Sequence, residues 1–163
     1  LKELRGYVEQ AILHTRSLTF ELSPPILYEL GLEAALEWLA EQVHEQHGIH
    51  YEFENDNQPK PLSDEIRVFL FTAVRELLVN VAKHANAQKV KVTVRRLGEN
   101  ISIHVADDGI GFSVSSMNSY MDKNKGFGLF SIRERLSHLG GQMEIRAQRG
   151  RSSRICLLAP LKL

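Results

Sequence analysis

The hydrophobic positions of residues 63–87 recur at the spacing of an amphipathic α-helix, three and four residues apart. The stripe consists of Ile66, Phe69, Leu70, Ala73, Val74, Leu77, Leu78 and Val81. Ser63 is a suitable N-cap, and Asp64 and Glu65 lie in the first turn, where the helix dipole favours acidic side chains. These features predict one helix with a core-facing stripe over residues 63–87.

Polar side chains follow one flank of this stripe. On a helical wheel of about 100° per residue, the flank carries Glu76, Asn80, Lys83 and His84. A carboxylate and an amide one turn apart, followed by a cation one turn later, can hold a hydrated divalent metal and a phosphate chain. The flank is therefore expected to face a half-buried crevice, and a solvated helix edge is the alternative.

Further helices and strands are predicted on both sides of this helix. Residues 1–22 have the spacing of a coiled-coil or bundle helix that ends at Ser23-Pro24-Pro25, and a second helix begins after Gly31 and ends near Gly48. Alternating apolar positions predict strands at residues 49–54, 89–96, 101–105, 143–146 and 154–158, and another helix covers residues 129–139. The expected fold is a two-layer α+β sandwich with a mixed, mainly antiparallel sheet, preceded by a dimerisation helix.

The composition narrows the classes of partner and compartment. The chain has 163 residues with 20 basic and 20 acidic side chains, so its charge gives no reason to expect nucleic acid or a membrane surface as partner. Its single cysteine, Cys156, excludes an intramolecular disulfide and is expected in the core. No apolar run has membrane-spanning length, and the chain starts in mid-helix at Leu1. We expect a cytoplasmic piece of a longer protein, such as a membrane receptor.

Two glycine-containing motifs follow the central helix. Residues 107–111, Asp-Asp-Gly-Ile-Gly, come at the end of a strand, where glycines let backbone approach a flat ligand and an aspartate can accept from an amine. Residues 126–129, Gly-Phe-Gly-Leu, lie where a helix begins, and the free N–H groups of a helix N-terminus suit phosphates. Either motif alone is also compatible with an ordinary loop, and neither has P-loop or Rossmann spacing.

The order of these motifs resembles the GHKL superfamily of ATPases and kinases. The N box of that superfamily matches residues 75–85, and its two glycine boxes match residues 107–111 and 126–129. Residues 22–25 (LSPP), 83–87 (KHANA) and 132–136 (IRERL) are similar to segments of sensor histidine kinases that work with NarL-type response regulators. The resemblance covers nearly the whole chain and implies a histidine-kinase-type ATP-binding fold.

The resemblance implies roles for the residues of the N box and the first glycine box. Glu76 would be the catalytic residue that polarises a water or the acceptor beside the γ-phosphate, and Asn80 would coordinate Mg²⁺. Lys83 and His84 would face the phosphate chain of ATP. Asp107 would receive the adenine amino group.

The glycine motifs and the closing strand take further roles by the same resemblance. Room for the adenine ring would come from Gly109 and Gly111, and the phosphates would be wrapped by Gly126, Phe127, Gly128 and Leu129. The polar residues 113–125 would form a mobile lid over ATP. Ser153 keeps a hydroxyl where the family usually has threonine, whereas Ser152 stands at a position that is usually glycine.

The implied function is that of the ATP-binding catalytic domain of a two-component sensor histidine kinase. Residues 31–163 would form this domain, and residues 1–30 the second helix of a dimerisation hairpin with its Pro-Pro linker. The protein would use ATP and Mg²⁺, form a homodimer through the N-terminal helix and serve a NarL-type response regulator. The acceptor histidine would precede Leu1, since His14 lacks the acidic neighbour of the acceptor motif. An anti-sigma-type serine kinase and a non-catalytic, nucleotide-regulated dimerisation module are the alternatives.

Overall fold

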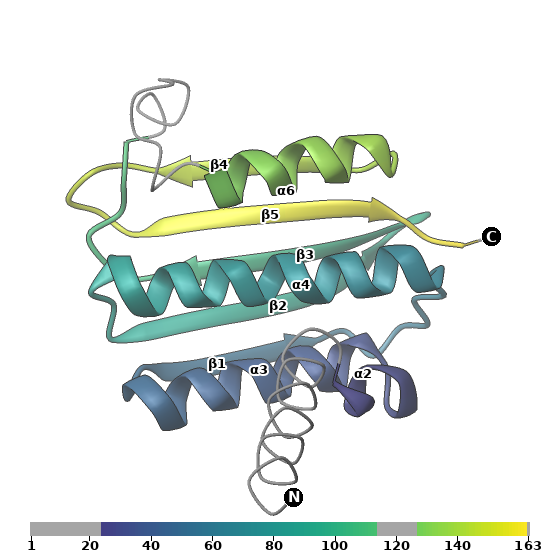
Figure 1. The fold of residues 1–163 in the computed structure, drawn as a ribbon, viewed down its shortest axis with the longest axis horizontal. Coiled ribbons are helices and arrows are strands. Elements are labelled where there is room, and N and C mark those ends of the chain that lie inside the picture. Colours follow the sequence, from purple (N-terminus) through teal and green to yellow (C-terminus); the bar gives the residue numbers. More distant parts are fainter. Residues whose placement is uncertain (1–23, 114–126, 163) are drawn as a thin grey trace, which may run out of the picture.

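A five-stranded sheet with helices on one face forms the body of the molecule (Figure 1). The computed structural model describes residues 24–113 and 127–162, so the helix predicted at residues 1–22 lies outside the described part. The strands lie in the order β1-β2-β3-β5-β4, with β1 and β2 parallel and the other neighbours antiparallel. The predicted two-layer α+β sandwich with a mixed, mainly antiparallel sheet is confirmed.

The helices and strands lie close to their predicted places. They are α2 (Pro25–Glu29), α3 (Leu32–His47), β1 (His50–Asn55), α4 (Asp64–Asn80), the π-helical turn η1 (Val81–Ala85), β2 (Lys89–Leu97), β3 (Asn100–Asp107), α6 (Phe127–His138), β4 (Gln142–Ala147) and β5 (Ser153–Pro160). In the described part, none of the helices is both long and apolar enough to cross a membrane.

The short helix α2 has no counterpart in the sequence prediction. It begins directly after Pro24, with Pro25 at its first position, where the missing N–H of proline breaks no helical hydrogen bond. Its Leu27 is fully buried and belongs to the main hydrophobic core. This part of the Pro-Pro segment therefore packs with the body, and the domain boundary after residue 30 stays a prediction.

The central helix α4 begins as its sequence predicts and ends differently. The Ser63 hydroxyl caps it by accepting the N–H of Ile66 at 3.3 Å, and Asp64 and Glu65 occupy its first turn. The α-helix ends at Asn80, and η1 follows as a π-helical turn that Asn86 closes with a left-handed φ of 48°. The single regular helix expected as far as residue 87 was wrong in this last part, because a π turn changes the rotation per residue.

The core lies between the helices and one face of the sheet. Among its fully buried side chains are Phe71 and Leu77 of α4, Leu36 of α3, Leu136 of α6, and Ile103 and Leu157 of the sheet. Burying a side chain of this size stabilises the fold by about 1.5–3 kcal/mol. The two layers thereby place the C-terminal end of α4 at the edge of the sheet where β3 ends and β5 begins (Figure 1).

The opposite face of the sheet, here called the open face, carries the alternate side chains of each strand. Cys156 lies on it, with its sulfur 3.6 Å from both the Ser102 hydroxyl and Nε2 of His104. Burial and the nearby positive charge of Arg154 lower the pKa of His104. The expectation that Cys156 is a core residue was wrong, because Ile155 and Leu157 take the core-facing positions of β5.

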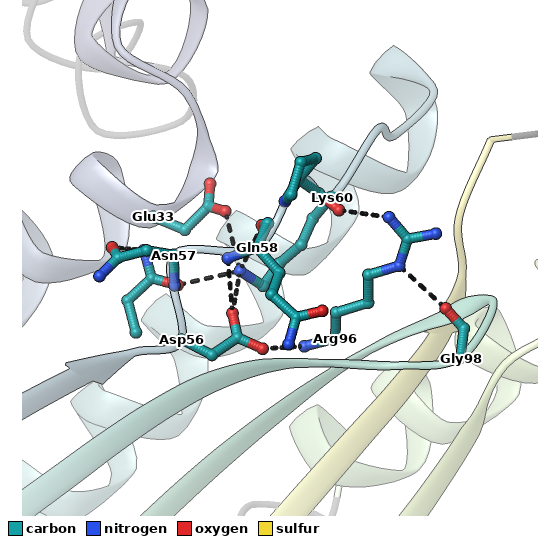
Figure 2. A network of polar contacts seen from close by, with 9 residues as sticks. Glu33, Asp56, Asn57, Gln58, Lys60, Arg96 and Gly98 are labelled. Atoms are coloured by element: carbon teal, nitrogen blue, oxygen red, sulfur yellow. Dashed lines mark hydrogen bonds and ion pairs between the residues drawn. The ribbon is translucent and has the colours of Figure 1, made fainter.

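A polar network fixes the loop between β1 and α4 against β2 (Figure 2). The Lys60 ammonium, whose side chain is 1% exposed, lies 2.6 Å from a carboxylate oxygen of Asp56 and donates to the Gln58 carbonyl at 2.9 Å. The other oxygen of Asp56 accepts the N–H of Arg96 at 2.7 Å. The hydrogen bond from Lys60, followed by that from Arg96, lowers the pKa of Asp56 to about 2.

Candidate functional site

Asp107 ends β3 at the edge of the core, and its side chain is held from two sides. Only 6% of the residue is exposed. One carboxylate oxygen accepts the N–H of Gly109 at 2.9 Å, and the other accepts the hydroxyl of Ser153, its cross-strand partner on β5. Each carboxylate oxygen can accept a second hydrogen bond, so the group is fixed in direction and still able to receive an external donor.

The glycines after Asp107 leave room for neighbouring protein backbone. A Cβ on Gly109 would lie 2.2 Å from the carbonyl oxygen of Ala85, to which the N–H of Ile110 donates at 2.8 Å. Gly111 has a φ of +57°, and a Cβ there would lie 2.0 Å from the carbonyl oxygen of Arg151. We expected these glycines to make room for a ring. The space that their missing side chains leave is instead taken by η1 and by the turn between β4 and β5.

Asp108 fastens the same loop to the start of β2, a contact that sequence reasoning missed. Its carboxylate oxygen Oδ1 accepts the N–H groups of Gln88 and Lys89, each at 2.9 Å. An aspartate directly after a strand is a common acceptor for backbone donors, so the signal was present but not specific. These two hydrogen bonds, together with the one from the N–H of Ile110 to Ala85 in η1, hold the loop against the segment that follows α4.

Glu76 of α4 lies against the beginning of α6. A Cβ on Gly128 would come within 2.6 Å of a carboxylate oxygen of Glu76, so only glycine leaves this carboxylate in place. An acidic side chain near the first turn of a helix is stabilised by the helix dipole. Leu129, the next residue, is 7% exposed and anchors α6 in the core. The N box and the beginning of α6, about 50 residues apart in the chain, are thus in contact.

One turn after Glu76, Asn80 ends α4 with a partly exposed side chain. Neither side chain has a hydrogen-bond partner among residues 24–113 and 127–162, so both can take external ligands. The same residues contain no group of three or more His, Cys, Asp and Glu side chains placed to hold a metal. A divalent metal here would therefore rest on the Asn80 amide oxygen together with phosphate oxygens and water, a ligand set that suits Mg²⁺.

The remaining predicted residues lie in η1 or at the edge of the described part. Lys83 and His84 are exposed on η1, and the π turn removes them from the regular flank that carries Glu76 and Asn80. Gly126 lies outside the described residues, as do residues 114–125 of the predicted lid. Phe127 is the first residue of α6.

Similar proteins were found by sequence and by fold. The family described as histidine kinase-, DNA gyrase B-, and HSP90-like ATPase matches residues 65–163. The oxygen sensor histidine kinase NreB of Staphylococcus carnosus is 30% identical over 160 residues, which are 98% of this chain and 45% of NreB. The chain therefore spans about half the length of this relative.

Two solved structures share the fold. The histidine kinase domain of the blue-light activated histidine kinase from Erythrobacter litoralis EL346 matches with a TM-score of 0.62 and 22% identity, over 80% of this chain and 61% of that one. A second structure of that kinase matches with a TM-score of 0.61 and 21% identity, over 80% of this chain and 42% of that one. At 22% and 21% identity these two structures support the fold alone. The chain belongs to the family of histidine kinase-, DNA gyrase B- and HSP90-like ATPases, the GHKL superfamily.

Proposed function

We propose that this chain is the ATP-binding catalytic domain of a two-component sensor histidine kinase. It binds Mg-ATP and transfers the γ-phosphate to a histidine that precedes Leu1 in a longer, dimeric protein, for relay to a NarL-type response regulator. The family match and the similarity to NreB support the kinase class. The N-terminal helix as dimer contact and a cytoplasmic location are parts of the same proposal.

One observation carries this proposal: three separate segments meet at the C-terminal end of α4. The loop after β3 contacts η1 through the N–H of Ile110 and the carbonyl of Ala85. The beginning of α6 contacts α4 where Gly128 meets Glu76. A flat base beside Asp107 and a phosphate chain between Asn80 and α6 would therefore lie along one continuous path.

Each polar side chain of the site has a different role in nucleotide binding and phosphoryl transfer. Asp107 receives the exocyclic amine of adenine, because Ser153 and Gly109 fix the direction of its carboxylate. Asn80 holds the metal, which neutralises phosphate charge when bound. Glu76 orients the acceptor or a water beside the γ-phosphate. Phosphoryl transfer needs positioning and charge neutralisation more than covalent help, which suits a site of this kind.

Calorimetric titration with ADP, with and without Mg²⁺, tests the nucleotide site. Asp107→Asn should weaken ADP binding about tenfold or more, since a hydrogen bond to a charged group contributes about 1.5–3 kcal/mol. Asn80→Ala, which removes the amide oxygen proposed to bind the metal, should reduce the dependence of binding on Mg²⁺. Asp64→Asn, an exposed change in the first turn of α4, is the matched control and should bind ADP like the unchanged chain. Unchanged ADP affinity in the Asp107 variant would show that the adenine assignment is wrong.

The nature of the acceptor is tested on the longer protein. A chain extended to include the preceding residues should become labelled from γ-labelled ATP, and the label should be lost in acid, because phosphohistidine is acid-labile. An acid-stable label would instead favour the serine kinase. ATP binding without transfer to any supplied acceptor helix would favour a nucleotide-regulated module.

A further inference from the structure

The open face of the sheet carries a basic hollow behind the site described above. Its volume is about 610 Å³, and it lies over β2, β3 and β5 beside the turn that joins β4 to β5. This face lies opposite the helices of Figure 1, whereas Glu76 and Asn80 lie on α4. The cations that line the hollow are Lys89, Lys91, Arg146, Arg151 and Arg154. Asp107 and Ser153 of the proposed nucleotide site border the hollow at one end, whereas its cations on the strands lie on the open face.

The floor of the hollow has a small side chain between two cations. Ala106 pairs across the sheet with Lys91 on β2 and with Arg154 on β5, and Arg154 pairs in turn with Arg146 on β4. Neighbouring strands lie about 4.8 Å apart, so Lys91 and Arg154 flank Ala106 with about 10 Å between their backbones. The methyl group of Ala106 leaves the space beside Arg154 open, whereas the Lys91 ammonium forms an ion pair with Glu54 at 2.6 Å.

The acidic residues of the hollow are already bound, and two arginines are not. Glu52 forms an ion pair with Lys89 at 2.5 Å, and this contact lowers its pKa. The Asp108 carboxylate accepts two backbone N–H groups, and the Asp107 carboxylate accepts the N–H of Gly109 and the hydroxyl of Ser153. Within residues 24–113 and 127–162 no carboxylate pairs with Arg151 or Arg154. Two guanidinium groups at one hollow are thus available to an anion.

We propose that this hollow binds a small molecule that carries two or more phosphate groups. A guanidinium matches phosphate oxygens with two parallel hydrogen bonds, and two guanidinium groups without a carboxylate partner at one hollow favour a multiply charged ligand. The volume is larger than one phosphate needs and lies within the range of small-molecule sites, about 300–1,000 Å³. Inorganic polyphosphate and the phosphate chain of a metabolite share this chemistry.

Binding of inorganic tripolyphosphate, followed by the NMR amide shift of Lys91, tests the proposal. The titration is done at physiological salt without magnesium, which the proposed phosphate site at Asn80 requires. We expect saturable binding that Arg151→Gln and Arg154→Gln each weaken about tenfold, as loss of a charge-assisted hydrogen bond predicts. Ala106→Leu, which fills the floor without a charge change, should also weaken it.

Arg95→Gln is the matched control, since Arg95 lies on the same face, outside the hollow, with 60% of its side chain exposed. Its affinity should stay within about twofold of the unchanged chain, because an exposed charge is largely screened. Equal weakening by Arg95→Gln and Arg154→Gln would show only diffuse surface charge and overturn the proposal. The proposal would also be overturned if binding were not saturable or if Ala106→Leu bound tripolyphosphate normally. Tighter binding of citrate than of tripolyphosphate would overturn it as well.

Discussion

Removal of the Ser153 hydroxyl is the sharpest test of how the site positions Asp107. Ser153 and Asp107 are both buried, at 7% and 6% exposure, and the hydroxyl donates to one oxygen of the carboxylate. In Ser153→Ala that oxygen loses its protein donor while it stays out of water. A buried polar group left without a partner costs about 1–3 kcal/mol of folding free energy. In a domain of this size that corresponds to a decrease in Tm of about 2–10 °C.

The same change should weaken nucleotide binding. With one of its two fixed contacts gone, the Asp107 carboxylate can rotate away from the direction in which it would meet the adenine amine. We expect about tenfold weaker ADP binding by calorimetry, which corresponds to about 1.4 kcal/mol. Ser153→Thr keeps the hydroxyl and should retain both stability and affinity within a factor of about three.

Ser102→Ala is the matched control for this experiment. Ser102 is 1% exposed and its hydroxyl lies 3.1 Å from Nε2 of His104 on the open face, away from Asp107. Urea unfolding should show a loss of stability in both alanine variants, with weaker ADP binding in Ser153→Ala alone. If Ser102→Ala weakened ADP binding as much as Ser153→Ala, the loss would come from general destabilisation, and the positioning role of Ser153 would be refuted.

Three further results are expected. Gly109→Ala should destabilise the chain by about 1–3 kcal/mol in urea unfolding, because its Cβ would lie 2.2 Å from a backbone carbonyl oxygen. Gly98→Ala meets no atom within 4 Å and should cost only the backbone strain of its positive φ of +61°. The pKa of Asp56 is lowered to about 2, mainly by the hydrogen bond from Lys60, so the ionised carboxylate should stabilise the fold above pH 4, and this stabilisation should be lost as the pH falls toward 2. Asp56→Asn should flatten this pH dependence of the free energy of unfolding, and Asp64→Asn should leave it unchanged. This chain alone should acquire no stable label from γ-labelled ATP, since the phosphate-accepting histidine is expected before Leu1. Stable labelling of this chain would make His14 the candidate acceptor.

The fold was largely predictable because periodicity reports which face of each element is buried. Alternation in β2 and β3 predicted the hairpin, and the three-and-four spacing of α4 predicted its core face. The short helix α2 was missed, because a proline pair indicates a break and five residues are too few for a period. Cys156 was placed on the wrong face because its residue type outweighed the alternation of β5.

The candidate site was predictable in its residue types and less so in their contacts. Spacing placed Glu76 and Asn80 one turn apart on α4, and the structure adds that Glu76 meets Gly128. No pattern along the chain shows that Gly109 packs on Ala85, because that contact joins segments more than 20 residues apart. A glycine motif indicates a close approach, and only the fold shows which group approaches.

The π turn η1 explains why the two ends of the polar flank separate. Glu76 and Asn80 precede it and keep α-helical spacing, whereas Lys83 and His84 lie within it and are exposed. Residues at the turn rotate relative to a regular helix, and the Ala85 carbonyl becomes free to accept the N–H of Ile110. The irregular turn that broke the helical prediction is thus the element that joins α4 to the loop after Asp107. It follows that a regular helix through residues 81–85 would remove this contact and separate the two halves of the proposed nucleotide site.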